Sequence, residues 1–276
     1  MEPQEEKEMS FLDHLETLRW NLIRSVVAVV LVSIAAFLNK RLIFDIILFG
    51  PKKSDFITYR LFCRLSEKLH QWVPSLVEKG DICIGQEMPK LQNITMAGQF
   101  TTHITVALIA GIIISFPYIV WEMWRFVKPA LRETEKKYTS GVVFFASSLF
   151  LTGLLFGYFL VVPLAVNFLL NYQVSEEVIN LPTLSNYISL VTMITLACAV
   201  VFELPLMIYF LTKIGIVGPE FLRKFRRHSI VAILIIAAII TPSPDIFSQL
   251  LVAFPLYFLY EISIFISASV AKKQKA

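Results

Sequence analysis

The stretch TSGVVFFASSLFLTGLLFGYFLVVPLAVNFLL, residues 139–170, contains no Asp, Glu, Lys or Arg. As an α-helix it is longer than the roughly 30 Å of hydrocarbon in a bilayer. With it, six apolar blocks can be drawn along the chain: 20–38, 97–120, 139–170, 187–211, 229–240 and 246–267. The pattern predicts an all-α membrane protein, a single domain of six transmembrane helices.

The composition agrees with a bilayer as the solvent. The 276 residues are 56% hydrophobic and 17% charged, against about 25% charged in soluble domains. The net charge of +4 comes from basic residues scattered over short connectors, which argues against nucleic acid as a partner. The first block is too long for a signal-peptide core and ends at Phe37-Leu38-Asn39-Lys40 without a small-residue cleavage site. We therefore expect the first helix to remain in the mature protein.

Lys and Arg in the connectors predict the orientation. The connectors 171–186 and 241–245 carry neither. The connectors after the second and fourth blocks and the C-terminal tail are basic, through Arg125, Lys128, Arg132, Lys136, Lys137, Lys213, Arg223, Lys224, Arg226, Arg227, Lys272, Lys273 and Lys275. Because positive connectors stay in the cytoplasm, both termini are predicted to be cytoplasmic.

The connector 39–96 is also basic, yet this scheme places it outside the cytoplasm. At nearly 60 residues it is at the limit where the charge rule fades, and six acidic residues offset its charge. Within it, Ser54-Asp55 can cap a helix with apolar positions at Phe56, Tyr59, Phe62, Leu65, Leu69 and Trp72. We therefore expect a small folded extracytoplasmic cap.

The three cysteines divide between this connector and a span. Cys63 and Cys83 lie in the connector, where an oxidising compartment permits a disulfide that closes a loop of about 20 residues. The sequence leaves both the bonded and the free form open, since it does not fix the distance between the two Cα atoms. Cys198 lies in the fourth block and is expected to be a small apolar filler.

The fifth block is short. Its 12 residues extend about 18 Å as a helix before Pro242 and Pro244. It is therefore either a buried half-span or a span around which the bilayer thins.

Ionisable and polar groups at membrane depth are the first functional candidates. Glu203 precedes Pro205, which kinks the helix and makes room for a polar contact open to the cytoplasm. Glu261 lies in the sixth block; each carboxylate has a purely structural role as its alternative. Asp245 is expected to cap the sixth helix, with Gln249 one turn later as an inward-facing polar group.

No reaction chemistry is indicated. His14, His70, His103 and His228 are scattered without metal-ligand spacing, and no nucleophile motif or phosphate loop occurs, so neither an enzyme nor a bound cofactor or metal is predicted. An intramembrane hydrolase would need a nucleophile and a base at depth, which the sequence lacks. A small-solute or ion permease stays open as the alternative, although it should show paired broken helices and only the fourth block is interrupted.

Five segments, in order along nearly the whole chain, resemble the TatC family, the multispanning subunit of the twin-arginine protein translocase. They are Phe11-Leu12-Asp13-His14-Leu15-Glu16-Thr17-Leu18-Arg19, the stretch from Phe116-Pro117 through Trp124-Arg125-Phe126-Val127-Lys128-Pro129-Ala130-Leu131, Phe202-Glu203-Leu204-Pro205, Leu222-Arg223-Lys224-Phe225-Arg226-Arg227, and Thr241-Pro242-Ser243-Pro244-Asp245-Ile246-Phe247-Ser248-Gln249.

The resemblance implies a receptor in the cytoplasmic membrane rather than an enzyme. Its N-terminal helix and first cytoplasmic connector would bind the twin-arginine signal peptide of a folded cargo protein, with Glu16, Thr17, Arg19, Phe126, Leu131 and Glu135 as site residues. Glu203, Pro205, Asp245 and Gln249 would meet the inserted signal or the single-span TatA- and TatB-type subunits. It further implies self-association in a receptor complex, contact with membrane lipid, and export driven by the proton gradient.

Two departures from the family pattern matter. The N-terminal motif of the family usually reads His-Leu-x-Glu-Leu-Arg, whereas here Thr17 holds the Glu position and the carboxylate is at Glu16. A shift of one residue rotates a side chain by about 100° around a helix. Either Glu16 reaches the same arginine through a different rotamer, or Glu135 carries more of the binding. The connector 39–96 is also longer than the family norm.

Overall fold

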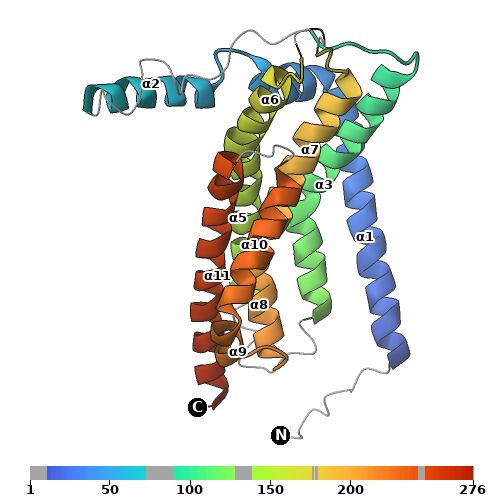
Figure 1. The fold of residues 1–276 in the computed structure, drawn as a ribbon. Coiled ribbons are helices and arrows are strands. Elements are labelled where there is room, and N and C mark those ends of the chain that lie inside the picture. Colours follow the sequence, from blue (N-terminus) through green and yellow to red (C-terminus); the bar gives the residue numbers. More distant parts are fainter. Residues whose placement is uncertain are drawn as a thin grey trace, which may run out of the picture. The chain divides into compact units, whose positions relative to one another are not determined.

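The computed structural model describes residues 11–72, 90–127, 139–175, 177, 180–241 and 246–275. These residues are mostly helical (Figure 1). In chain order the α-helices are α1 (Phe11–Leu38), α2 (Ile57–Trp72), α3 (Gly98–Val127), α5 (Thr139–Phe156), α6 (Val162–Asn171), α7 (Leu184–Val201), α8 (Leu204–Lys213), α9 (Pro219–Lys224), α10 (Arg226–Ile240) and α11 (Ile246–Lys275). Short π or 3-10 helices are η1 (Leu42–Leu48), η2 (Gly50–Lys52) and η4 (Gly157–Val161).

Five helical segments are long and apolar enough to cross a membrane. They are Leu15–Leu38, Gly98–Phe126, Gly141–Asn171, Leu184–Lys213 and Ser248–Lys272. The prediction of an all-α multispanning protein is thus confirmed, whereas the count of six spans is not. The helix of the fifth block, α10, has 15 residues and extends only about 22 Å.

The exposure of α10 bears on the two alternatives for the fifth block. Ile233, Ala237 and Ile240 are buried, but Val231 and Ile235 on the opposite side are exposed. A half-span enclosed by protein would bury both sides. The exposed apolar side therefore favours a short helix that contacts lipid where the bilayer thins.

The chain forms two compact units, which are described separately: residues 1–39 with 104–147, and residues 40–103 with 148–276. In the first unit, α1 and α3 run antiparallel in contact. A Cβ on Gly111 would lie 2.0 Å from the Ser33 Oγ and 2.8 Å from the Val29 carbonyl oxygen. About three turns away, the Asn21 side chain donates a hydrogen bond to the Glu122 carbonyl (3.4 Å). Small residues at Gly111 and Ser33 allow this approach.

In the second unit, the long span α5–η4–α6 passes from the π-helix η4 into α6 next to Pro163. Proline has no N–H, so the carbonyl of Phe159 one turn earlier loses its usual helical donor. The Thr58 hydroxyl of α2 donates to that carbonyl instead. Pro163 therefore leaves free the carbonyl to which α2 is attached.

The span α5–η4–α6 packs on α7 through two glycines one turn apart, Gly153 and Gly157. A Cβ on Gly153 would lie 2.7 Å from the Cβ of Phe202, and one on Gly157 would lie 2.9 Å from the Cβ of Cys198. This is the small-xxx-small packing by which membrane helices approach closely. As predicted, Cys198 is a buried filler, with a free thiol.

Tyr59 and Tyr187 hold the described part of the long connector against the spans, whereas residues 73–89 lie outside the described residues, so the cap as a whole stays a prediction. The Tyr59 hydroxyl donates to the Pro51 carbonyl within the connector (2.7 Å) and to the Pro163 carbonyl of α6 (3.4 Å). The Tyr187 hydroxyl of α7 donates to the Leu48 carbonyl of the connector (2.9 Å). Burial raises the pKa of the Tyr59 phenol above its ordinary value. Cys63 in α2 is disulfide-bonded, but Cys83 lies outside the described residues, so the pairing of the two stays a prediction.

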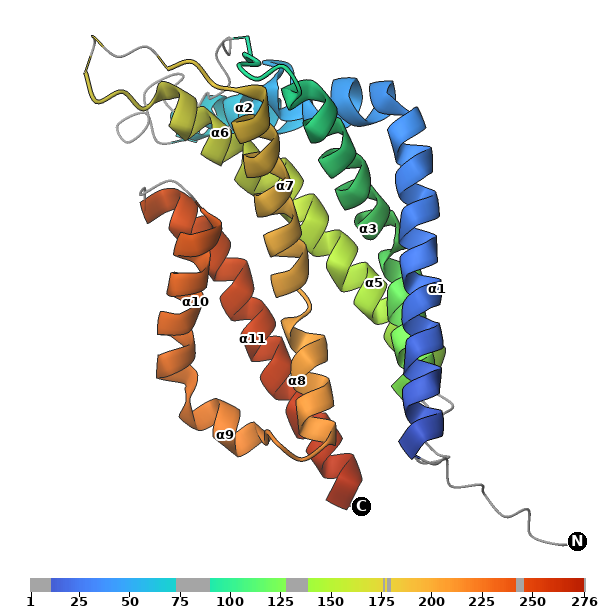
Figure 2. The ribbon, with the colours of Figure 1, turned by 90° about the vertical axis from the view of Figure 1, so that its right-hand side faces the viewer.

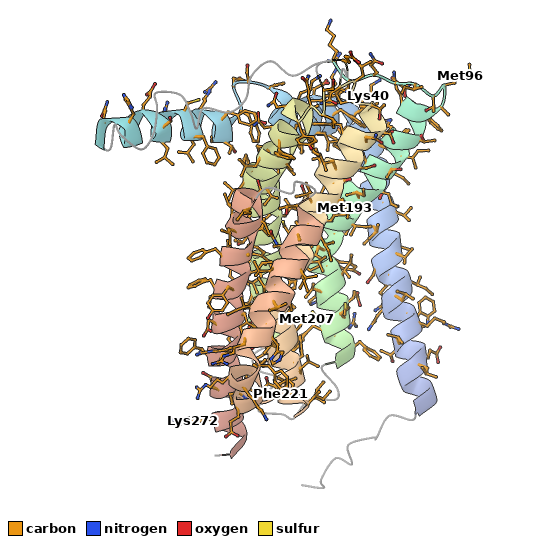
Figure 3. The ribbon with its side chains drawn as sticks, in the orientation of Figure 1. Lys40, Met96, Met193, Met207, Phe221 and Lys272 are labelled. Atoms are coloured by element: carbon orange, nitrogen blue, oxygen red, sulfur yellow. The ribbon has the colours of Figure 1, made fainter. Side chains whose placement is uncertain are left out.

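The rest of the second unit is built around α11. Helices α8, α9 and α10 all contact it, and Figure 2 shows α10 and α11 as a hairpin, with α9 beside the end of α8. Lys40 and Met96 lie at one end of this unit, and Phe221 and Lys272 at the other (Figure 3). The long connector and the basic α8–α10 connector therefore lie at opposite ends of this unit, and the orientation in the membrane stays a prediction.

Candidate functional site

A pocket of about 570 Å³ lies between the N-terminal half of α1 and the C-terminal end of α3. Its lining residues are Glu16, Thr17, Trp20, Asn21, Arg24 and Arg125. The five from α1 share one helical face, because they are spaced by about one turn. The hydrogen bond from Asn21 to the Glu122 carbonyl keeps this face against α3.

The pocket contains one carboxylate and two guanidinium groups. The Glu16 side chain is 64% exposed and forms an ion pair of 3.8 Å with Arg19 on the next turn. An exposed pair of this kind contributes only about 0–1 kcal/mol, so Glu16 is free to exchange Arg19 for another guanidinium. Arg24 and Arg125 add positive charge beside it, which favours anionic groups of a ligand and weakens the pull on cationic ones.

Tryptophans surround this end of the first unit. The Arg19 guanidinium lies 5.8 Å from the ring centroid of Trp20, and that of Arg125 lies 5.8 Å from that of Trp121. Trp and Arg gather where a span leaves the hydrocarbon layer. The pocket therefore opens at a membrane surface.

The predicted signal-binding residues are only in part brought together. Glu16 and Thr17 line the pocket, and Arg19 is paired with Glu16. Phe126 is half-buried and directly follows the pocket residue Arg125. Leu131 and Glu135 lie outside the described residues, so their place at this site stays a prediction.

Sequence reasoning missed Glu122, a carboxylate next to the pocket. Its side chain is 1% exposed, and the Tyr118 hydroxyl donates to its Oε1 (2.8 Å). Its Oε2 is buried without a hydrogen-bond partner among the described residues. The apolar block was drawn only to residue 120, whereas α3 continues to Val127. A carboxylate between Trp121 and Trp124 was the available signal.

The second unit holds the predicted intramembrane carboxylate. Pro205 breaks the fourth block as expected, since α7 ends at Val201 and α8 begins at Leu204. Glu203 lies in this break with both carboxylate oxygens buried. Among the described residues, it has a contact with the Phe150 backbone that falls short of full hydrogen-bond geometry. An unsatisfied carboxylate at depth is costly, so Glu203 stays the first functional candidate of this unit.

The remaining polar candidates are Gln249 and Asp245. Gln249 donates to the Leu234 carbonyl of α10 (3.1 Å), so it holds α11 to α10. Asp245 lies outside the described residues. No group of three or more His, Cys, Asp or Glu side chains that could hold a metal ion is found within the described ranges.

Glu261 has a structural environment. It pairs with Arg226 at the start of α10 (2.7 Å) and accepts a hydrogen bond from Tyr257 (2.9 Å). The Tyr260 hydroxyl, on the same helix, donates to the Leu222 carbonyl of α9 (2.7 Å). These contacts attach the α9–α10 connection to α11, which supports the packing alternative for this carboxylate.

We expect Glu261→Ala to lower the free energy of unfolding by about 2 kcal/mol, in the range of a charge-assisted hydrogen bond. Arg226 would lose its partner near the membrane interface. Thermal unfolding of the detergent-solubilised protein measures the change, and Glu220→Ala, an exposed α9 carboxylate, is the control. A loss no larger than that of the control would contradict the structural role.

Comparison with known proteins places this arrangement in a family. Residues 13–255 match the family model described as Sec-independent protein translocase protein (TatC). The chain is 43% identical over 270 residues to the TatC protein of Blattabacterium sp. subsp. Periplaneta americana, covering 98% of this chain and 99% of that protein. It is 34% identical over 270 residues to TatC of Carboxydothermus hydrogenoformans, covering 98% and 97%.

Two crystal structures of the twin-arginine translocase receptor TatC have the same fold. One has a TM-score of 0.61 and 31% identity, covering 94% of this chain and 99% of that chain. The other, determined in the detergent DDM, has a TM-score of 0.66 and 32% identity, covering 92% and 99%. The similarity therefore extends over the fold as well as the sequence.

Proposed function

This chain belongs to the TatC family of Sec-independent protein translocase proteins, and we propose that it is the subunit that reads the twin-arginine signal peptide of a folded cargo protein. As a family member it is a multi-pass protein of the cytoplasmic membrane and a transport component rather than an enzyme. The signal is read on the cytoplasmic side, with both chain termini on that side.

The pocket between α1 and α3 carries this proposal. It offers the exposed carboxylate of Glu16 and the indole of Trp20 to an incoming guanidinium, which can accept paired hydrogen bonds and stack on the ring. Arg24 and Arg125 repel a second guanidinium within the same pocket. The second arginine of the signal therefore goes to Glu135, with Phe126 and Leu131 receiving the apolar residue that follows.

The second part of the proposal is that single-span TatA- and TatB-type subunits dock on α7 and α10. These two helices form an apolar groove of about 390 Å³. Its lining residues are Leu196, Ala197, Val200, Val201, Ile236, Ile239 and Ile240. Glu203 follows the lining residue Val201 by two positions, and it would give an inserted helix or signal a polar partner at depth. The proton gradient would supply the energy, with no bound cofactor.

A small-solute or ion permease remains the second candidate because it too would use Glu203. Among the described spans, α7–α8 is the one interrupted by non-helical residues at depth. Permeases built on broken helices use a pair of them. The receptor is therefore the better-supported function.

Photocrosslinking tests the receptor directly. A photoreactive residue is placed at Thr17 or Phe126 in native membranes, and a labelled signal peptide is added with either Arg-Arg or Lys-Lys. We expect crosslinks that fall at least tenfold with Lys-Lys, since ammonium groups lack the paired donor geometry. A probe at Phe258, an exposed α11 residue, is the control. Crosslinks of equal yield with the Arg-Arg and Lys-Lys peptides would contradict the receptor and favour the permease, in which Glu203 is a transport site.

The partner surface has its own test. Photoreactive residues at Val200 and Ile239, both exposed beside the groove, should crosslink to TatA- or TatB-type subunits. The same probe at Phe258 should give several-fold less product. Equal yields at all three positions would mean that the groove is not a preferred docking site.

A further inference from the structure

Helix α2 of the second unit projects away from the spans and is attached to them by its first turn. Phe56, just before it, stacks on Phe159 of η4, with ring centroids 5.7 Å apart and an interplanar angle of 14°. The Thr58 hydroxyl donates to the carbonyl that Pro163 leaves free, and the buried Tyr59 hydroxyl approaches the Pro163 carbonyl (3.4 Å). These contacts fix the direction of α2 across the line of α5 and α6 (Figure 1).

Beyond this attachment, α2 has an exposed apolar stripe. Ile57 and Leu61 are each 64% exposed and Leu65 is 46% exposed; their spacing of four residues puts them on one helical face. Arg60, Arg64, Glu67 and Lys68 are exposed as well. Figure 3 shows nitrogen-tipped side chains on one side of α2, and all-carbon side chains on the side that faces along the spans. A soluble cap would not gain from such a stripe.

The depth at which α2 is attached along the span indicates what covers its apolar stripe. Its attachment points, Phe159 and Pro163, lie inside the apolar segment Gly141–Asn171. Pro163 precedes the end of that segment by eight residues, or about 12 Å of helix. The first turn of α2 is therefore at the depth where headgroups meet acyl chains.

The apolar surface is also continuous with a lipid-facing one. Leu151, Leu155 and Phe159 are exposed at four-residue intervals along the span, and Phe159 is the residue on which Phe56 stacks. The apolar residues of α2 thus extend the lipid-facing side of the span, and α2 runs across that span. This is the arrangement expected of a helix that lies at the surface of one leaflet. Basic residues beside such a stripe reach back to phosphate headgroups.

We propose that α2 is an interfacial membrane helix. Ile57, Leu61 and Leu65 enter the acyl region of the adjacent leaflet, and Arg60, Arg64 and Lys68 contact its phosphate headgroups. In the orientation given above this is the outer leaflet, and anionic phospholipid is the preferred lipid. The site lies in the second unit, whereas the proposed signal-binding pocket lies in the first.

Depth-dependent quenching tests the proposal on the full chain, reconstituted as one copy per nanodisc. An environment-sensitive fluorescent amino acid replaces Leu61, Leu65 or, as the control on the opposite face, Glu67. Lipids brominated in the acyl chain should quench positions 61 and 65 at least threefold more than position 67, with blue-shifted emission at 61 and 65. Equal quenching at the three positions, or water-like emission at 61, overturns the proposal.

Two variants separate lipid from protein as the occupant. With the reporter at residue 57, Leu61→Ser/Leu65→Ser should lose at least half of the quenching while the Tm stays unchanged, because both side chains are exposed. Arg64→Gln/Lys68→Gln should abolish the difference between phosphatidylglycerol and phosphatidylcholine discs. Absence of quenching in single-copy discs, together with crosslinks from position 61 to another protein in cells, would assign the stripe to a protein partner instead.

Discussion

Replacing Gly153 with valine is expected to lower the free energy of unfolding by at least about 3 kcal/mol, the upper end of the usual cost of overpacking. A Cβ at this position would lie 2.7 Å from the Cβ of Phe202 and 2.8 Å from the carbonyl oxygen of Cys198. Neither atom can rotate away, because both positions are fixed by the α7 backbone. The helices α5 and α7 must therefore separate, or the protein fails to accumulate.

Thermal unfolding of the detergent-solubilised protein, read by size-exclusion recovery, measures this loss. Gly141→Val is the matched control, since Gly141 lies in the same helix with no neighbouring atom within 4 Å of an added Cβ. Valine has a better helix propensity than glycine, so the control should match or exceed the native Tm. A Gly153 variant as stable as this control would contradict the close packing of α5 on α7.

Gly153 also bears on the proposed function because Phe202 directly precedes Glu203. The milder variant Gly153→Ala would place its Cβ at the same 2.7 Å from the Phe202 Cβ, so Phe202 must shift for the variant to fold. The Glu203 carboxylate, whose two oxygens are already buried without full hydrogen bonds, would move with it. The pair of glycines therefore positions the break between α7 and α8 as well as holding the helices together.

The spans could be predicted from the sequence because each is a local run of apolar residues of membrane length. The break at Glu203 could be predicted for the same reason, since Pro205 acts on its own helix. The helix α2 followed from its three- to four-residue periodicity. The fifth block is not among the five segments long and apolar enough to cross a membrane, because its helix, α10, extends only about 22 Å.

The pairings between distant segments could not be predicted. Gly153-Leu-Leu-Phe-Gly157 is a small-xxx-small pattern that sequence reasoning could have noticed, yet nothing local indicates that α7 is its partner. Likewise, Pro163 predicts that the carbonyl of Phe159 lacks its helical donor. It does not predict that Thr58, over a hundred residues earlier, donates to that carbonyl. Such contacts depend on the tertiary arrangement of helices rather than on their own sequence.

The candidate pocket was also predicted only in part from the sequence. Glu16 and Thr17 were identified through the family resemblance, and both line the pocket. Arg24 and Arg125 were not assigned to it, because charge in a connector or at a helix end indicates topology as readily as a site. Their presence changes the expected charge of the pocket and makes the contribution of each carboxylate testable.

Glu135→Ala is expected to weaken twin-arginine peptide binding at least tenfold, and Glu16→Ala less than threefold. Tenfold corresponds to about 1.4 kcal/mol, which is the lower end for a hydrogen bond to a charged group. Glu16 contributes less because the positive charges of Arg24 and Arg125 in the same pocket oppose the binding of a guanidinium there. Titration of a fluorescent signal peptide into the purified protein measures both losses.

Thr17→Glu provides the decisive control, because it restores the carboxylate that the family motif places on this helix face. Combined with Glu135→Ala, Thr17→Glu should recover at least a third of the affinity for the twin-arginine peptide that Glu135→Ala removes. Thr17→Gln, which has a side chain of equal size but no charge, should recover none. Equal losses for the two alanine variants, or a larger loss for Glu16→Ala, would show that Glu16, despite its 100° displacement, binds a signal arginine at least as strongly as Glu135 does. In that case the pocket on α1 and α3, rather than the connector that holds Glu135, is the main arginine site.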